Sequence, residues 1–200
     1  MVDSAFYNIF KDELLNGEEI LWAGQPDPTV LFSKSDIFNI PFGIFWMGFS
    51  IVWEGAAIKA VLNPNADKAA SWSFPFFGVP FVLIGIYLIA GRFFYKAWKK
   101  KRTYYAVTNM RVLVVKQSRR KDVQGAYLDA IPVVNKSIRR DGRGTITFGN
   151  STTGGWMYED AGLDFLGAYY TERAPAFRDI ADAEKVCRLV IDSRKTREHT

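Results

Sequence analysis

Two long apolar runs dominate the pattern of hydrophobic and polar positions along the chain. Residues 72–91 are twenty consecutive positions without a charged side chain, and residues 37–53 are a second uncharged run that ends at Glu54. A helix rises about 1.5 Å per residue, so twenty residues reach across the roughly 30 Å hydrocarbon core of a bilayer. A chain of 200 residues could hardly bury such a helix on every side. The pattern therefore predicts a two-helix transmembrane hairpin over 37–95.

The predicted hairpin consists of helices over about 37–60 and 72–95, joined by a polar outer loop over 63–71. The first apolar run is short for a span, and continuing it through the residues that follow gives ample length. Glu54 and Lys59 then lie near one membrane surface, where long side chains reach water. The alternative is that Glu54 faces the second helix and has a role within the membrane. We favour the position near the surface.

The charged side chains are unevenly distributed on the two sides of this hairpin. Residues 1–36 carry a net charge of −5 and residues 92–200 a net charge of +10, within an overall charge of +5. The outer loop carries only Asp67 and Lys68. Basic residues in short flanks remain on the cytoplasmic side of a membrane. The pattern therefore predicts that both termini are cytoplasmic, and the first twenty residues do not resemble a cleavable signal peptide.

Beyond the second run, the hydrophobic period changes from helical to extended. Residues 103–117 are rich in β-branched and aromatic side chains and are interrupted at 108–110, which predicts two strands joined by a tight turn. Residues 123–128 are a candidate third strand. The pair Asp141 and Gly142 supplies the turn of a further hairpin, because aspartate and glycine tolerate the positive φ that such a turn requires. Several antiparallel strands therefore follow the transmembrane segments.

A final amphipathic helix is predicted over 179–194, with Asp179 as its N-cap. Together with the strands, this helix makes a cytoplasmic domain over 99–194, followed by a tail over 195–200. Strands that come before a single helix favour a small antiparallel β-barrel or bent sheet that the C-terminal helix closes. The fold class is therefore α+β.

The N-terminal region, residues 1–36, precedes the hairpin and has structure of its own. Its pattern predicts a short helix over 3–15 and a strand over 19–23, ahead of a proline-rich turn. An isolated strand is not stable in water, so we expect this strand to dock on the cytoplasmic domain. The helix and the strand should both pack against that domain.

Segments spread over nearly the whole chain carry a family likeness. They are GEEILWAGQP before the first apolar run, the two runs themselves, RTYYAVTNMRVLVV directly after the second run, GRGTITFG, and AFRDIADAEKVCRLV near the end. Together these segments resemble small bacterial membrane proteins with a pleckstrin-homology-like (PH-like) domain. The resemblance implies a PH-like antiparallel β-barrel with a C-terminal capping helix, held at the bacterial inner membrane by the hairpin. It also implies no enzymatic activity.

The residue inventory offers little for catalysis or metal binding. The chain has one cysteine and one histidine, so a disulfide framework, a cysteine or histidine metal site and a histidine-based triad are not expected. Glu159, Asp160 and Asp164 cluster in the sequence, but the glycines around them favour a solvated loop over an acid–base pair. We therefore expect no enzyme activity, no cofactor and no metal.

Two groups of basic residues are candidates for contact with a membrane surface or a partner. The juxtamembrane group consists of Arg92, Lys96, Lys99, Lys100, Lys101 and Arg102. Each of these residues can contribute about 1 kcal/mol to the free energy of binding to anionic lipid. The second group is the turn Arg119, Arg120 and Lys121, a candidate lipid or partner contact, although a solvated turn is the simpler interpretation.

The function expected from these features is a non-catalytic scaffold or accessory subunit. It would bind a protein partner or a membrane complex through an exposed sheet edge or groove. The alternative is binding of anionic lipid head groups through the basic region 92–121. Nucleic-acid binding ranks lowest, because the lipid bilayer already accounts for the basic run.

Overall fold

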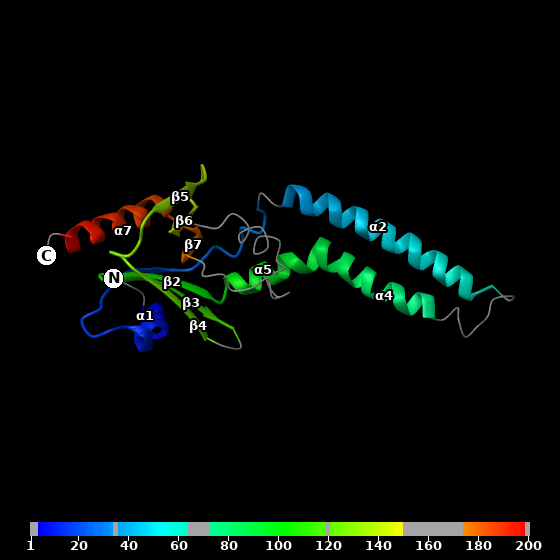
Figure 1. The fold of residues 1–200 in the computed structure, drawn as a ribbon, viewed down its shortest axis with the longest axis horizontal. Helices are drawn as coiled ribbons and strands as arrows, with labels where there is room; N and C mark the ends of the chain where they lie inside the picture. Colours follow the sequence, from blue (N-terminus) through cyan, green and yellow to red (C-terminus); the bar gives the residue numbers. More distant parts are fainter. Residues whose placement is uncertain (1–3, 34–35, 64–72, 119–120, 150–173, 199–200) are drawn as a thin grey trace. The chain divides into compact units, whose positions relative to one another are not determined.

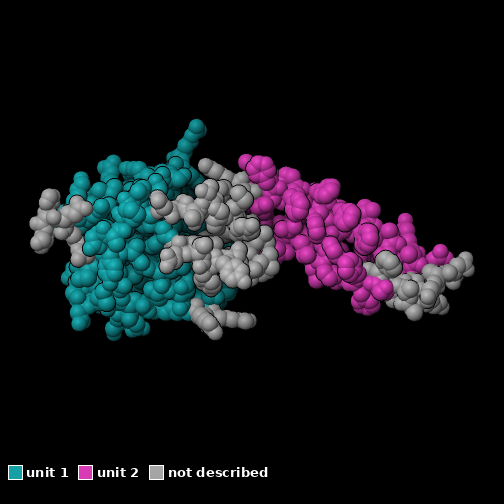
Figure 2. Space-filling model, viewed as in Figure 1, with its two compact units in different colours: residues 1–31, 96–156, 169–200 teal, residues 32–95, 157–168 magenta. Residues whose placement is uncertain are grey.

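The computed structural model of the chain describes residues 4–33, 36–63, 73–118, 121–149 and 174–198 (Figure 1). The fold is α+β, and the described residues belong to two compact units (Figure 2). We call the part within residues 32–95 the hairpin unit. The described residues of 1–31, 96–156 and 169–200 form the sheet unit.

The hairpin unit is built from two long helices. The first is α2 (Asp36–Val61), and the second consists of α4 (Ser73–Ile86), the π-helical turn η2 (Tyr87–Gly91) and the start of α5 (Arg92–Lys100). α2 packs against α4, and each long helix contains a stretch of 26 residues, Asp36–Val61 and Pro75–Lys100, that is long and apolar enough to cross a membrane. The prediction of two helices of spanning length is confirmed. The second helix continues to Lys100, beyond the predicted end at residue 95. The basic residues between these two positions are therefore helical.

Trp46 of α2 fixes the packing of the two long helices. Its Nε1 donates a hydrogen bond to the carbonyl oxygen of Phe81 in α4 at 3.1 Å, and the two rings stack with centroids 5.8 Å apart. Further along α4, a Cβ at Gly85 would lie only 2.9 Å from the Sδ of Met47. The missing side chain at Gly85 therefore lets the helices approach closely, as small residues do in membrane helix pairs.

Glu54 lies well inside α2 and faces α4. A Cβ at Gly78 would overlap the Oε2 of Glu54, and that oxygen is buried without a hydrogen-bond partner among the described residues. The continuation of the first helix past Glu54 is confirmed, since α2 ends at Val61. The Glu54 side chain points toward the second helix, which is the alternative interpretation of the sequence and not the favoured one. A role for Glu54 within a membrane stays a prediction.

The sheet unit contains two antiparallel sheets. In the first, the strand order is β1 (Ile20–Gly24), β2 (Thr103–Thr108), β3 (Arg111–Gln117) and β4 (Lys121–Tyr127). In the second, it is β5 (Val134–Ile138), β6 (Gly144–Phe148) and β7 (Ala176–Ile180). The last helix, α7 (Ala183–Glu198), contacts β5 and β6, and α1 (Ser4–Phe10) with the 3-10 turn η1 (Lys11–Glu13) precedes β1.

The strand before the hairpin pairs with the first strand after it. β1 and β2 are antiparallel, with Gly24 opposite Tyr105 and Ala23 opposite Ala106. The fully buried Phe10 of α1 packs into the cluster formed under this sheet. The docking predicted for the N-terminal strand is therefore confirmed, and the hairpin is an insertion between two neighbouring strands of one sheet.

Aromatic side chains form the centre of the sheet unit. The Phe177 ring lies 4.8 Å from that of Tyr105 and 4.9 Å from that of Phe148, measured between centroids. Val186 and Val190 of α7 are buried in the same cluster. Each such side chain stabilises the fold by about 1.5–3 kcal/mol when fully buried. This cluster joins α7 to strands of both sheets.

The predicted start of the last helix is wrong. Residues 176–180 form β7, and α7 begins at Ala183. The apolar Phe177 and Ile180 are fully buried as strand residues that pair along β6, although their spacing also suits a helix face. Asp179 is therefore a strand residue, and its φ of +47° is unusual for a side chain other than glycine.

Candidate functional site

The first juxtamembrane basic residue, Arg92, is buried in the hairpin unit. Its side chain has an exposed fraction of 0%, and its Nη2 lies 3.1 Å from Oδ1 of Asp36. Asp36 also holds the turn that leads into α2, because its Oδ2 accepts a hydrogen bond from the Ser33 N–H at 2.6 Å while its own N–H donates to the Ser33 carbonyl at 3.0 Å. Arg92 and Asp36 therefore tie the start of α2 to the start of α5.

Lys100, at the end of α5, is held inside the sheet unit. Its Nζ donates to the Asp179 carboxylate at 2.6 Å, to the Asp27 carbonyl at 3.2 Å and to the Val30 carbonyl. The hydroxyl and the N–H of Thr29 hold the pKa of Asp27 below its ordinary value. Lys100 therefore fastens the segment that leads into the hairpin to β7.

The other juxtamembrane basic residues are more accessible. Lys101 and Arg102 are exposed, and the Arg102 guanidinium lies 4.3 Å from the centroid of the Trp98 ring. Lys96 and Lys99 are partly buried and take part in interactions within the protein. Contact of this group with anionic lipid stays a prediction, and Lys101 and Arg102 are its best-placed members.

In the second basic group, Arg119 and Arg120 lie outside the described residues. Lys121 begins β4, and its Nζ lies 2.7 Å from a carboxylate oxygen of Glu13. Both side chains are partly exposed. A role of this turn in lipid or partner contact therefore stays a prediction.

The acidic cluster of Glu159, Asp160 and Asp164 also lies outside the described residues. Within the part of the chain that the structure describes, no group of three or more histidine, cysteine or acidic side chains could hold a metal ion. Cys187 is buried in the core, and burial raises the pKa of its thiol. A thiol with a raised pKa is a poor nucleophile at neutral pH.

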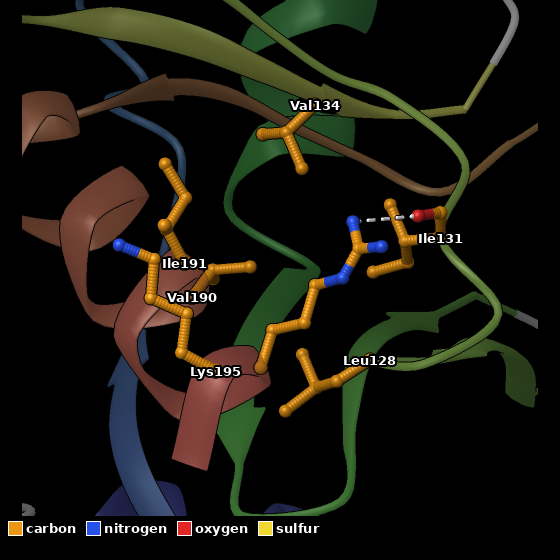
Figure 3. A pocket seen from close by; sticks show the side chains of 7 residues that line it. Leu128, Ile131, Val134, Val190, Ile191 and Lys195 are labelled. Atoms are coloured by element: carbon orange, nitrogen blue, oxygen red, sulfur yellow. Dashed lines mark hydrogen bonds between the residues drawn. The ribbon is translucent and has the colours of Figure 1, made fainter. Parts of the chain in front are cut away.

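A pocket of about 220 Å³ lies between α7 and the chain that connects the two sheets (Figure 3). It is lined by Leu128, Ile131, Val134, Val190, Ile191, Arg194 and Lys195. Leu128, Ile131 and Val190 are buried, whereas Ile191 is 39% exposed. The pocket therefore has an apolar floor that opens to the surface beside Ile191.

The charged side chains that line this pocket are both basic. The Nη1 of Arg194 donates to the carbonyl oxygen of Ile131 at 3.1 Å, the hydrogen bond that is dashed in Figure 3. This bond holds the connection between the sheets against α7. Lys195 is exposed. The pocket therefore combines an apolar interior with a positively charged rim.

β5 runs beside this pocket and has a free edge in the described part of the chain. Gly149 donates to the carbonyl of Val133, and Arg139 donates to the carbonyl of Arg143, so the odd-numbered residues of β5 face β6. In an antiparallel pair, the alternate residues point their N–H and C=O groups the other way. Val134, Lys136 and Ile138 therefore direct these groups away from β6, where the described residues supply no neighbouring strand.

Sequence analysis did not identify this site. Its apolar members look like ordinary core residues, and its two halves are about sixty positions apart in the chain. The only available indication was the polar stretch Asn135–Lys136–Ser137 within a predicted hairpin, which is typical of a strand at a sheet edge. That pattern alone does not say which helix lies beside the edge.

In comparisons with known proteins, no protein-family model, no curated protein and no solved structure matches this chain.

Proposed function

We propose that this chain is a non-catalytic, membrane-anchored module of PH-like architecture that binds a protein partner or a membrane complex. A four-stranded and a three-stranded antiparallel sheet followed by a C-terminal helix support the PH-like assignment. The two long apolar helices support anchoring in the bacterial inner membrane, and the basic residues after the second helix support cytoplasmic termini.

The free edge of β5 is the observation that favours a protein partner. Unpaired N–H and C=O groups on an edge strand form hydrogen bonds readily with an added strand. The pocket beside Val134 would receive a side chain of that strand. A scaffold or accessory subunit needs such a surface and needs no catalytic group.

Proline in place of Ile138 is expected to abolish partner binding with little effect on folding. The Ile138 N–H points away from β6, so proline removes a donor that no described strand uses and that a partner strand would use. The experiment is gentle solubilisation of native membranes, purification of the tagged full chain, and quantitative mass spectrometry of the subunits that accompany it. Loss of a stoichiometric subunit from Ile138→Pro is the expected result.

Ile138→Ala is the matched control for this substitution. It shortens the same side chain, which is 38% exposed, but keeps the backbone donor, and it should retain the partner. Circular dichroism should show that both variants remain folded. Recovery of the unaltered chain only as a monomer, or equal recovery of the partner with the proline variant, would contradict the proposal.

Binding of anionic lipid head groups is the second candidate function. The exposed Lys101 and Arg102 beside the Trp98 ring favour it, since aromatic and basic side chains gather at membrane surfaces. The full chain is the appropriate sample, because a fragment that starts after the hairpin would lack β1.

Lys101→Gln with Arg102→Gln is expected to reduce the retention of anionic lipid. The full chain would be extracted from vesicles of equal parts phosphatidylglycerol and phosphatidylcholine, and the bound lipids counted by native mass spectrometry. Removing two charges should lower the enrichment of phosphatidylglycerol severalfold, since each contributes about 1 kcal/mol. If the unaltered chain and the double variant retain the same bound lipids, Lys101 and Arg102 do not contribute to the binding of anionic lipid.

A further inference from the structure

The size of the pocket limits what can occupy it. Its volume of about 220 Å³ is below the roughly 300–1,000 Å³ of sites that enclose a drug-sized ligand or cofactor. Its floor consists of the buried Leu128, Ile131 and Val190. A space of this size and character suits one large apolar side chain rather than a whole small molecule.

The charges around the pocket indicate what should accompany that side chain. Arg194 and Lys195 are the charged residues that line it, and the described residues place no acidic side chain in its lining. Lys195 is exposed on the last turns of α7. An acidic group next to the apolar side chain would therefore meet an attractive potential, whereas a basic group would be repelled.

The neighbouring backbone indicates the conformation of the occupant. Val134 belongs both to the pocket and to the free edge of β5. Lys136, two residues further along this edge, forms an ion pair of 2.7 Å with Glu184 near the start of α7, while Val190 and Ile191 of the same helix lie at the pocket. α7 therefore runs antiparallel to β5, and a strand added to β5 would lie alongside this helix (Figure 1).

We propose that the groove between β5 and α7 binds an extended peptide segment of a partner protein, in which one large apolar side chain fills the pocket and adjacent acidic residues face Lys195. This inference rests on the proposed function and specifies the chemistry of the partner. The hydrogen bonds along β5 would give affinity, and the pocket and its basic rim would select the sequence.

A set of labelled peptides tests this chemistry directly. The probe is a fluorescein-labelled ten-residue peptide of high β-propensity, with one phenylalanine followed by acidic residues. One control peptide carries serine in place of phenylalanine, and another carries lysine in place of the acidic residues. Fluorescence anisotropy would be measured with the full chain in nanodiscs of phosphatidylcholine, a lipid without net charge. The apolar–acidic peptide should bind at least about tenfold more tightly than either control.

Two substitutions in the groove locate the binding. Lys195→Glu reverses the charge at the rim, and Ile191→Glu places a charge at the mouth of the pocket; each should weaken binding about tenfold. Lys185→Glu is the matched control, because it makes the same charge change on α7 at a highly exposed position that does not line the pocket. That control should bind like the unaltered chain.

The outcomes separate this inference from the function on which it rests. Equal binding of all three peptides, or binding unaffected by both groove substitutions, would overturn the apolar–acidic specificity. The same inference is overturned if no peptide binds. The binding of a partner at β5 is judged independently by whether the co-purifying subunit is lost from Ile138→Pro.

Discussion

Replacing Glu18 with glutamine is expected to lower the free energy of unfolding by about 3 kcal/mol at neutral pH. The Glu18 side chain is fully buried, and its two carboxylate oxygens accept hydrogen bonds from Nε and Nη2 of Arg111 at 3.0 and 3.1 Å. The Thr108 hydroxyl and the Leu15 N–H donate to the same carboxylate, each at 2.8 Å. Glutamine keeps the size but leaves the Arg111 charge without its counterion.

The effect of this substitution should depend on pH in a defined direction. Burial raises the pKa of Glu18, but the hydrogen bonds from Arg111, the Leu15 N–H and Thr108 outweigh it, so the pKa is lowered from its ordinary value of 4.5. A lowered pKa in the folded state stabilises the protein fully above the pKa of the unfolded chain, and this contribution is lost as the pH falls through the folded value. The difference in the free energy of unfolding between the unaltered chain and the Glu18→Gln variant should therefore decrease as the pH falls below about 4.5.

Denaturant unfolding of the full chain in detergent, followed by tryptophan fluorescence at several pH values, measures both effects. Glu19→Gln is the control, since it removes a charge from the neighbouring position, and it should change the stability little. A Glu18→Gln variant as stable as the unaltered chain at pH 7, or a difference that does not change with pH, would contradict the prediction.

Replacing Asp36 with asparagine is expected to destabilise the hairpin unit by about 3 kcal/mol. Arg92 is fully buried, and none of its guanidinium nitrogens makes a hydrogen bond in the part of the chain that the structure describes. The Asp36 carboxylate, close enough for an ion pair but not aligned for a hydrogen bond, compensates its charge. Asparagine keeps an oxygen that can accept the hydrogen bond from the Ser33 N–H, so the change acts mainly on the ion pair.

A double-substitution cycle isolates the contribution of the pair. Arg92→Met combined with Asp36→Asn removes both charges, so the double variant should be more stable than Asp36→Asn alone. The readout is the loss of helical circular dichroism on titration of the detergent-solubilised full chain with sodium dodecyl sulfate. If the two single effects simply add in the double variant, the ion pair does not couple the helices.

The local pattern of hydrophobic and polar residues predicts the main helices and strands. The apolar runs are long enough to define the two helices without any knowledge of their neighbours. The change to β-branched residues after the second run predicted β2 and β3, and the instability of an isolated strand predicted that β1 would pair. These inferences depend only on local patterns and on the need to satisfy the backbone.

Features that depend on tertiary contacts were not predictable in this way. Phe177 and Ile180 are three positions apart, a spacing that suits a helix, and only their pairing with β6 makes them strand residues. Arg92 and Lys100 belong to a basic run for which the sequence predicts contact with a membrane surface, yet Asp36 and Asp179 bind them from distant positions in the chain. The groove beside β5 likewise exists only when α7 lies along that strand.

The hairpin lies in the sequence between β1 and β2, so pairing of these two strands would depend on the membrane topology of the two helices if they span a bilayer. β1 is synthesised before both apolar helices and β2 after them, so the two strands can pair only when they lie on the same side of a bilayer. If only one helix were inserted, the strands would be separated by the membrane, and the first sheet would lack its edge strand. The Glu18 carboxylate would then also lose Arg111. For a chain whose two apolar helices span a membrane, insertion of both is thus a condition for completing the first sheet, and a chain with a single crossing would expose an unfinished sheet to proteases.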